Sequence, residues 1–351
     1  MTSTTTRGLS SGGRPTLRQV AAAAGVSRAT ASRVVNGGHL VSPQAKAAVE
    51  AAIDELGFTP HPVARSLARR RTGSVALVVP EPNARILSDP YFATTINGLA
   101  RELEDSDLQM ILLIDRRSGT TDRMSRYLAS GHVDGAVIAS HHRGDPLNTT
   151  VPASGLPVVF IGRPLDVPPG TRYVDVDNHH GARIAVHHLI ATGRRRIGTV
   201  AGPPDMSAAI DRLEGWRAAL AEAELGGGKL RDDAMVHGDF TMEGGRLAAA
   251  ELLEAHPDLD AIFVASDLMA VGVLRELQAR GLRVPSDIAV VGFDDIGVAE
   301  HTEPPLTTIV QPVEEMAARA GALLQQLLEE PDSVSTEPVI YEPRLVVRAS
   351  A

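Results

Sequence analysis

From Val75 onward, short apolar runs alternate with segments of helical periodicity, and this alternation restricts the possible folds more than any other feature of the chain. The first apolar runs occupy residues 75–80, 109–115, 135–140 and 157–163, with helices expected near 90–104 and 121–130. Strands that are apolar on both faces and are joined by helices form parallel sheets covered on both sides. The pattern therefore predicts a doubly wound α/β body.

The same pattern then recurs at similar length. Further apolar runs occupy residues 173–178, 196–202, 234–240, 261–266 and 288–295, followed by 306–312 and 343–348. Two successive α/β units predict two lobes with a cleft between them. The first lobe is expected over about residues 74–162 plus 309–335, and the second over about 163–308 plus 336–348. Because ligands of open α/β sheets bind at the carboxyl ends of strands, the loops after these runs are the expected cleft wall.

Three short helices are predicted ahead of this body, over residues 14–59. The segment 16–19, Thr-Leu-Arg-Gln, has the form of a capping box. Gly25 suits a turn with positive φ, and Ser27 can cap the helix that follows. Ser42, followed by a proline, signals the start of a third helix. Helix, glycine turn, helix and third helix is the order of a helix-turn-helix DNA-binding module, with a plain three-helix surface subdomain as the alternative.

Charge separates the two parts of the chain. The first 72 residues contain ten Arg and Lys side chains against three acidic ones, although the whole chain has a formal charge of −9. A basic head on an acidic body indicates that the head meets a polyanion and that the body does not.

The length of 351 residues is typical of two or three domains. The chain contains no Cys, so disulfides and thiolate metal sites are excluded. The N-terminus lacks the apolar run of a signal peptide, and no segment reaches membrane-spanning length, so we expect a cytoplasmic, nucleoid-associated protein without a membrane partner. The Ser/Thr/Gly-rich residues 1–13 are predicted to form a disordered tail.

Residues 60–73 connect the predicted head and body. Prolines at its start can end the third helix and begin a short new one, and a basic run follows at residues 69–71. The segment is either a solvated linker or a hinge helix that folds only against DNA, with Leu67 as an apolar wedge in the minor groove.

The sequence carries no enzymatic signature. It has no G-x-S-x-G motif, no G-x-G-x-x-G follows the first apolar run, and Gly-Gly-Gly-Lys-Leu at 226–230 lacks the P-loop spacing. The histidine pairs 141–142, 179–180 and 187–188 have no acidic or sulfur partner that completes a metal-ligand set, so we interpret them as surface or helix-end histidines. No enzyme activity, metal or cofactor is expected.

From about Arg14 to Arg348 the chain resembles the lactose-repressor (LacI/GalR) family of bacterial transcription regulators. The resemblance rests on LRQVAAAAGVSRATASRVVN, FTPHPVARSLARRRTGSVALVVP, DPYF, RLEGW, ASDLMAVGVL and VVGFDDI followed by PPLTTIVQP. It implies a homodimer that binds a near-palindromic operator through its heads. It also implies a two-lobed, periplasmic-binding-protein-like body that senses a small effector and takes part in dimerisation.

The resemblance assigns roles in DNA binding by position. Arg28 and Ala29 fall where the family reads bases, and Arg33 falls at a later base or phosphate contact. Arginine can bond guanine through two N–H groups, whereas alanine offers only apolar contact to a thymine methyl. The DNA-binding candidates are Thr16, Ser27, Arg28, Ala29, Thr30, Ser32, Arg33, Asn36, Arg65, Leu67 and Ala68. His61 and Pro62 depart from the family's more usual asparagine, which leaves the start of the hinge open.

The resemblance also assigns effector contacts. Arg212 and Asp294 match the family's effector-binding arginine and aspartate, and such a pair can hold vicinal hydroxyls because the arginine donates and the aspartate accepts. Phe92 and Phe240 match positions that pack on a ligand, and Ser266 stands where many relatives have asparagine. The lesser candidates, at strand ends, are Asp115, Ser140, Arg163 and Gln311.

The resemblance therefore implies a repressor of carbohydrate-utilisation genes whose operator affinity is controlled by a sugar or sugar derivative. A corepressor-dependent or activating regulator is one alternative. A soluble sugar-binding protein without a regulatory role is the other, and a signal peptide would favour it.

Overall fold

A computed structural model describes residues 15–35, 41–58, 71–114, 121–223 and 233–351. The chain divides into two compact units, residues 1–73 and residues 74–351. The expected disordered tail and most of the expected hinge lie outside the described residues.

The first unit consists of three helices, α1 (Leu17–Ala23), α2 (Arg28–Val35) and α3 (Pro43–Leu56). Helices of this length are marginal in isolation, so their stability comes from packing. Each contributes a fully buried side chain to one small core: Val20, Ala31 and Val49 all have 0% exposure.

The helix ends of this unit carry the predicted caps. Thr16 accepts a hydrogen bond from the Gln19 backbone N–H, while the Gln19 side chain accepts one from the Thr16 N–H at 2.8 Å, which completes the capping box. Ser42 Oγ accepts from the Ala45 N–H at 3.3 Å. Gly25 has a φ of +65°, and a Cβ there would meet nothing within 4 Å. The turn therefore needs glycine for its backbone angle and not for space.

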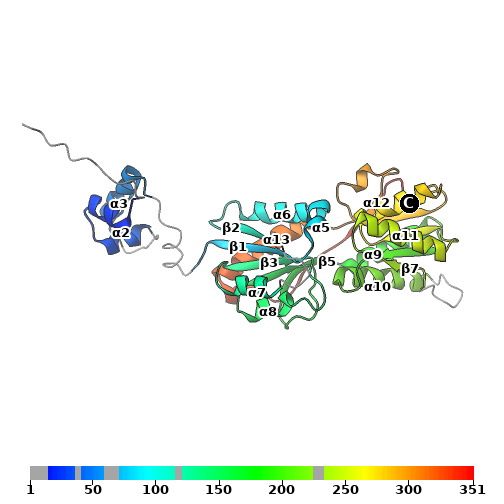
Figure 1. Ribbon diagram of the computed structural model, residues 1–351, viewed down its shortest axis with the longest axis horizontal. Coiled ribbons are helices and arrows are strands. Elements are labelled where there is room, and N and C mark those ends of the chain that lie inside the picture. Colours follow the sequence, from blue (N-terminus) through cyan, green and yellow to red (C-terminus); the bar gives the residue numbers. More distant parts are fainter. Residues whose placement is uncertain (1–14, 36–40, 59–70, 115–120, 224–232) are drawn as a thin grey trace, which may run out of the picture. The chain divides into compact units, whose positions relative to one another are not determined.

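The second unit contains two six-stranded sheets (Figure 1). The first has the order β11-β5-β4-β3-β1-β2, and its strands are β1 (Ser74–Val79), β2 (Gln109–Ile114), β3 (Gly135–Ala139), β4 (Val158–Ile161), β5 (Arg172–Val176) and β11 (Val339–Tyr341). The second has the order β12-β10-β9-β8-β6-β7, and its strands are β6 (Ile197–Ala201), β7 (Met235–His237), β8 (Ala261–Val264), β9 (Ala289–Asp294), β10 (Thr307–Val310) and β12 (Arg344–Val346).

Helices cover both faces of each sheet. On the first sheet α6 (Pro90–Leu103) packs with α13 (Val313–Glu329), and α7 (Thr121–Ala129) with α8 (Leu147–Ala153) lies on the opposite face (Figure 1). On the second, α9 (Asn178–Ala191) packs with α10 (Ser207–Glu222), and α11 (Met242–Ala255) packs with α12 (Asp267–Ala279). Short helices α5 (Asn83–Ser88), η1 (Ala299–His301) and η2 (Pro331–Ser333) complete the unit. The predicted doubly wound, two-lobed body is confirmed.

The lobe limits differ from those expected. Strand β5 pairs with β4 and β11 in the first sheet, so the first lobe continues to about residue 176 and does not end near 162. Residues 339–341 were also assigned to the second lobe, where no strand was expected, but they form β11 and pair with β5 in the first sheet. Chain order alone does not reveal pairing partners. Strand β12 pairs antiparallel with β10, so the second sheet is not wholly parallel.

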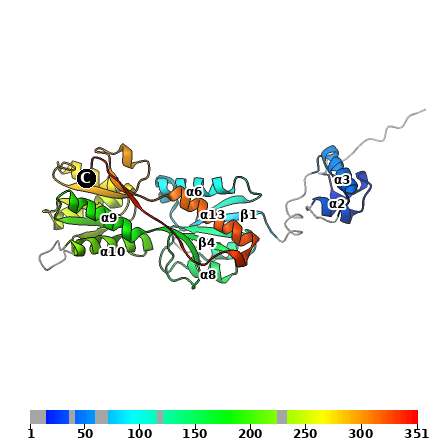
Figure 2. The same ribbon diagram turned by 180° about the vertical axis from the view of Figure 1, so that it is seen from behind.

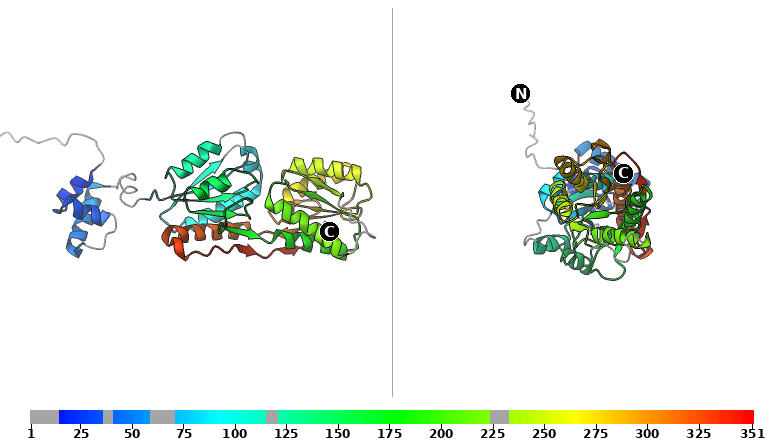
Figure 3. Two further views of the ribbon diagram at one scale, coloured as in Figure 1. Left: turned by 90° about the horizontal axis from the view of Figure 1, so that it is seen from below. Right: turned by 90° about the vertical axis from the view of Figure 1, so that its right-hand side faces the viewer.

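The chain passes between the two lobes near residues 176–178, 310–313 and 341–344. Figures 2 and 3 show the last of these connections, drawn in dark red, running from the first lobe to the second. Within the described parts of the chain, no helix is both long enough and apolar enough to cross a membrane.

Candidate functional site

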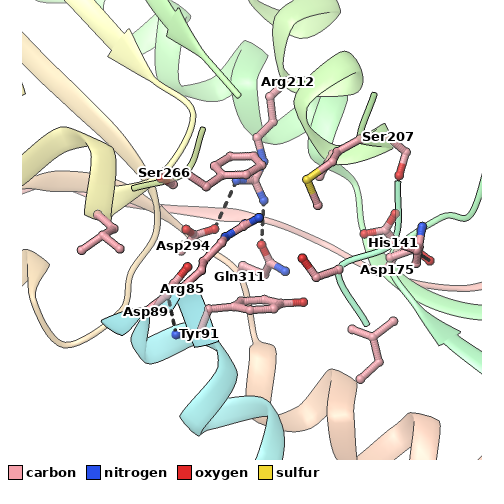
Figure 4. Close-up of a pocket in the computed structure, with 17 residues that line it drawn as sticks. Arg85, Asp89, Tyr91, His141, Asp175, Ser207, Arg212, Ser266, Asp294 and Gln311 are labelled. Atoms are coloured by element: carbon pink, nitrogen blue, oxygen red, sulfur yellow. Dashed lines mark hydrogen bonds and ion pairs between the residues drawn. The ribbon is translucent and has the colours of Figure 1, made fainter. Parts of the chain in front are cut away.

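A cleft lies between the two lobes, at the carboxyl ends of the strands of both sheets (Figure 4). Of the nine predicted effector contacts, the cleft is lined by Ser140, Arg212, Phe240, Ser266, Asp294 and Gln311. The remaining lining residues are Arg85, Asp89, Tyr91, His141, Ile161, Gly162, Asp175, Met206, Ser207, Ala208 and Leu268. The resemblance and the strand ends together therefore located five of the eleven polar side chains that line the cleft, from both lobes.

Arg212, on α10, is the most extensively bonded side chain of the cleft and is only 4% exposed. Its Nε donates to Asn178 Oδ1 at 2.8 Å, and its Nη2 donates to Gln311 Oε1 at 2.7 Å. Its Nη1 donates to the Ala265 carbonyl at 2.6 Å and to Asp294 Oδ1 at 3.2 Å. A guanidinium has five N–H groups, so these contacts hold the group in place while leaving one N–H on Nη2 for a ligand.

Asp294, at the end of β9, is the carboxylate opposite Arg212. It is 8% exposed, and burial raises its pKa to about 7 although the charge of Arg212 lowers it. The guanidinium also stacks on the ring of Phe293, with 3.6 Å between the guanidinium carbon and the ring centroid. Arg212 and Asp294 therefore form a buried donor and acceptor pair that a hydroxylated ligand can bridge.

Backbone strain is concentrated in the cleft wall. Ser140, Phe240 and Asp294 are not glycines, yet their φ values are +58°, +62° and +114°. Such conformations cost of order 1–3 kcal/mol each and persist where the surroundings enforce them. Here they turn the chain at strand ends where the side chains line the cleft.

The aromatic prediction for the motif DPYF is wrong for Phe92. Phe92 is 1% exposed and does not line the cleft; it packs edge-on against Tyr91, with 5.3 Å between ring centroids. Asp89 and Tyr91 line the cleft in its place, and Asp89 caps α6 by accepting from the Tyr91 N–H at 3.0 Å. Neighbouring residues of a helix start face different directions, which the motif alone does not resolve.

The side chain of Arg163 does not line the cleft either. Its Nη2 lies 2.6 Å from Asp211 Oδ1, an ion pair that joins the first lobe to α10 of the second. The backbone of Arg163 contributes instead: its carbonyl accepts from Ser207 Oγ, and its N–H donates to Asp175 Oδ2 at 2.8 Å. Asp115 lies outside the described residues.

Asp175 is a cleft carboxylate that the sequence analysis missed. It is 4% exposed, and burial raises its pKa to about 6, against hydrogen bonds from the backbone N–H groups of Arg163 and Val176 that lower it. It lies inside an apolar run at the end of β5. An acidic residue that interrupts such a run was the one signal that could have identified it.

The interpretation of His141 and His142 as surface or helix-end residues is wrong, because they are 4% and 3% exposed. Burial lowers the pKa of His141 to about 4, so its imidazole is neutral near pH 7, and its Nε2 lies 3.2 Å from the Gly162 carbonyl. Among the described residues, no group of three or more His, Asp or Glu side chains is arranged to hold a metal ion.

In the first unit, the predicted DNA contacts that the structure describes lie on α2 or at its start, except Thr16, which caps α1. Thr16, Ser27, Arg28, Ala29 and Arg33 are exposed, whereas Thr30 and Ser32 are half-buried. Ser27 Oγ accepts from the Thr30 N–H at 3.1 Å, so it caps α2 as predicted. The remaining candidates, Asn36, Arg65, Leu67 and Ala68, lie outside the described residues.

Both units have counterparts among known proteins. Residues 16–61 match the family "Bacterial regulatory proteins, lacI family", and residues 186–351 match "Periplasmic binding protein-like domain". The chain is 47% identical over 341 residues to the HTH-type transcriptional regulator CelR of Thermobifida fusca, which covers 96% of this chain and 98% of that protein.

Two solved structures extend the likeness to three dimensions. A CelR–cellobiose complex is 44% identical, with 96% of this chain and 100% of that chain covered and a TM-score of 0.76. The lac repressor dimer bound to operator and the anti-inducer ONPF is 27% identical, with 96% and 99% covered and a TM-score of 0.80. The likeness therefore spans both units of the chain.

Proposed function

This chain belongs to the LacI family of bacterial regulatory proteins, and from that premise we propose that it represses carbohydrate-utilisation genes until a sugar binds its cleft. It is a DNA-binding transcriptional regulator and not an enzyme. Its place of action is the cytoplasm, where it meets the nucleoid.

DNA recognition falls to the exposed start of α2. Arg28 bonds guanine O6 and N7 in the major groove, Ala29 contacts a thymine methyl, and Arg33 adds a later base or phosphate contact. Thr16, Thr30 and Ser32 position the phosphate backbone. Further DNA contacts come from Asn36, Arg65, Leu67 and Ala68, which lie outside the described residues. Leu67 is the minor-groove wedge of the hinge.

The effector is a neutral, hydroxyl-rich sugar, and cellobiose is the first candidate because the solved CelR complex contains it. The observation that carries this proposal is the buried Arg212–Asp294 pair, which presents an N–H donor and a carboxylate acceptor in one cleft. Asp89 and Asp175 add acceptors, and Tyr91 adds an aromatic surface of the kind that packs on sugar rings.

Two copies of the chain bind the two halves of a near-palindromic operator. The first lobe exposes large apolar side chains that suit a partner subunit: Leu87 on α5 is 85% exposed, and Leu112 on the edge strand β2 is 37% exposed. The structure of the lac repressor as a dimer supports the same assembly.

The experiment that tests the function begins by selecting duplexes from a random-sequence pool with the purified protein. Fluorescence anisotropy then measures the affinity for the selected duplex with and without cellobiose. Coupling free energies between two sites are typically about 1–3 kcal/mol, so cellobiose should weaken binding by about 5- to 150-fold. A tightening of binding instead identifies a corepressor.

The outcome that contradicts the proposal is a protein with no preference for any duplex over bulk DNA, with or without sugars. A preference for one duplex that no mono- or disaccharide alters, together with no sugar-induced rise in melting temperature, contradicts the sugar effector alone.

A further inference from the structure

Glu81 follows β1 and does not line the cleft, yet its side chain joins two residues that do. One oxygen, Oε1, accepts from Ser140 Oγ at 2.8 Å and lies 2.5 Å from Arg85 Nη1, and both Ser140 and Arg85 line the cleft. The same oxygen lies 2.9 Å from His142 Nε2. Glu81 is 2% exposed, so these contacts are made almost without water.

His142 carries this cluster across to the other lobe. It follows β3 of the first sheet, and its Nδ1 lies 3.0 Å from Oδ2 of Asp205, which follows β6 of the second sheet. The backbone reinforces the contact, since the Arg143 N–H donates to the Asp205 carbonyl at 2.7 Å. The Asn148 side chain donates to the His142 carbonyl at 2.8 Å, which anchors this segment to the first lobe.

The neighbours of Glu81 hold it in its ionised form. Burial by itself raises the pKa of Glu81, but the hydrogen bond from His142 and the charge of Arg85 outweigh it and hold that pKa below its usual value. Glu81 is therefore an ionised acceptor in the interior. The two ring nitrogens of His142 each lie beside a carboxylate oxygen, one in each lobe: Nε2 is hydrogen-bonded to Glu81, and Nδ1 approaches Asp205 Oδ2 to 3.0 Å without hydrogen-bond geometry.

We propose that Glu81 is a positioning residue that links ligand contacts in the cleft to closure of the two lobes, through His142 and Asp205. The inference rests on the proposed function, because it concerns regulation of the same cleft. A ligand that bonds Arg85 or Ser140 changes how these groups share the single Glu81 oxygen. This change shifts the position of His142 and so alters its contact with Asp205.

If Glu81 only packed the interior of the first lobe, its charge would not affect lobe closure; the proposed role predicts that it does. Glu81 does not touch the second lobe, yet its charge should affect how often the lobes are closed. Removal of that charge and removal of the Asp205 charge should therefore have the same effect, and the two effects should not add in the double variant.

The absence of cysteine from the chain makes closure measurable on the full-length protein. Spin labels are attached at Ala129→Cys on α7 and Glu214→Cys on α10, one exposed position in each lobe. Electron paramagnetic resonance then gives the distribution of interlobe distances without sugar and DNA. Glu81→Gln and Asp205→Asn are compared with the parent protein.

Glu222→Gln is the matched control. Glu222 also contacts an arginine and a histidine, with Arg183 Nη2 at 2.9 Å and His187 Nε2 at 3.0 Å, but all three residues lie within the second lobe. Because contacts of His142 and Arg163 join the lobes, the parent protein should show mainly short distances. Glu81→Gln and Asp205→Asn should each lower the ratio of short to long distances about tenfold, whereas Glu222→Gln should leave it unchanged.

An unchanged distance distribution in Glu81→Gln overturns the proposal, whatever Asp205→Asn does, and so do additive effects in the double variant. If Glu81→Gln does not fold, His142→Asn interrupts the same connection and is held to the same outcomes. The measurement uses neither sugar nor DNA. If cellobiose does not change operator affinity, the proposed effector is refuted, and the interlobe distance result is unaffected.

Discussion

Several residues of the cleft have backbone angles or buried charges that lower the stability of the folded chain. Binding of a ligand in the cleft accounts for their presence. Asp294 and Asp175 are buried carboxylates with raised pKa values, and Ser140 and Phe240 have strained backbones. None of these features stabilises the fold near pH 7. They hold charged and polar groups around the cleft between the lobes. The lost stability is the cost of a preorganised site.

The first residue-scale prediction concerns Arg212. Arg212→Ala removes the donors that hold Gln311 and Asp294 and the N–H left for a ligand, so cellobiose should no longer alter operator affinity, and its binding should weaken at least about 100-fold, a loss of about 3 kcal/mol. Isothermal titration calorimetry and operator anisotropy measure the two effects.

The control for Arg212 is Arg183→Ala, which removes a surface arginine of the same lobe. Operator affinity without sugar should stay at the parent value in both variants. If Arg212→Ala still responds to cellobiose, Arg212 has no role in effector binding.

The second residue-scale prediction concerns the pH dependence of stability at Asp175. Its pKa is about 6 in the folded protein and near 3.8 in the unfolded chain. Between these values the folded state holds the extra proton, so the stability contributed by Asp175 is present below pH 4 and is lost as the pH rises to 6. The shift corresponds to about 3 kcal/mol.

Urea unfolding of the parent protein and of Asp175→Asn at pH 4, 5, 6 and 7 tests this sign. The free energy of unfolding of the parent, relative to the variant, should fall by about 2 kcal/mol from pH 4 to pH 6 and level off near pH 7. A difference that is constant over this range would mean that the pKa of Asp175 is not raised.

At the scale of elements, local sequence signals predicted where helices begin, whereas tertiary pairing decided to which sheet a strand belongs. The helices α1, α2 and α3 begin at the caps that the sequence predicts, because a cap is a contact between residues three positions apart. Strands β5 and β11 were assigned to the wrong lobe, because a strand's sheet is set by hydrogen bonds to segments far away in the chain.

The element-scale prediction concerns the start of α3. Ser42→Ala removes the side chain that accepts from the Ala45 N–H, which should destabilise the first unit by about 1 kcal/mol. Hydrogen exchange of the α3 amides in the full-length protein should rise by about fivefold. Glu50→Gln, an exposed change in the same helix, should leave the exchange rates near those of the parent, and equal rates in both variants would contradict the cap's contribution.

At the scale of the whole molecule, the chain combines a basic reader of DNA with an acidic, two-lobed sensor. The lobes of the sensor are tied at separate points by Arg163 with Asp211 and by His142 with Asp205. In the proposed mechanism the sensor changes state by altering these contacts, and the change is measured as a change in the affinity of two copies of the chain for operator DNA.

The prediction at this scale concerns assembly. Leu112→Asp places a charge at the exposed centre of the edge strand β2, so the proposed dimer should dissociate and operator affinity should fall at least about 100-fold, or about 3 kcal/mol. Analytical ultracentrifugation measures the mass of the assembly. The same measurement on Leu247→Asp, on α11, tests whether the second lobe also contributes to the dimer interface. A Leu112→Asp protein that remains dimeric would place the interface elsewhere.

The sequence by itself determined the order of the elements, the basic head, the strand ends that form the cleft, and the pairing of Arg212 with Asp294 as a candidate site. These depend on periodicity, caps and motifs, which are properties of neighbouring residues. Only the tertiary structure decided the rest. It placed β5 and β11 in the first sheet, turned Tyr91 to the cleft and Phe92 away from it, and buried His142 between Glu81 and Asp205. Each of these results depends on which distant segments meet, and no local pattern encodes that.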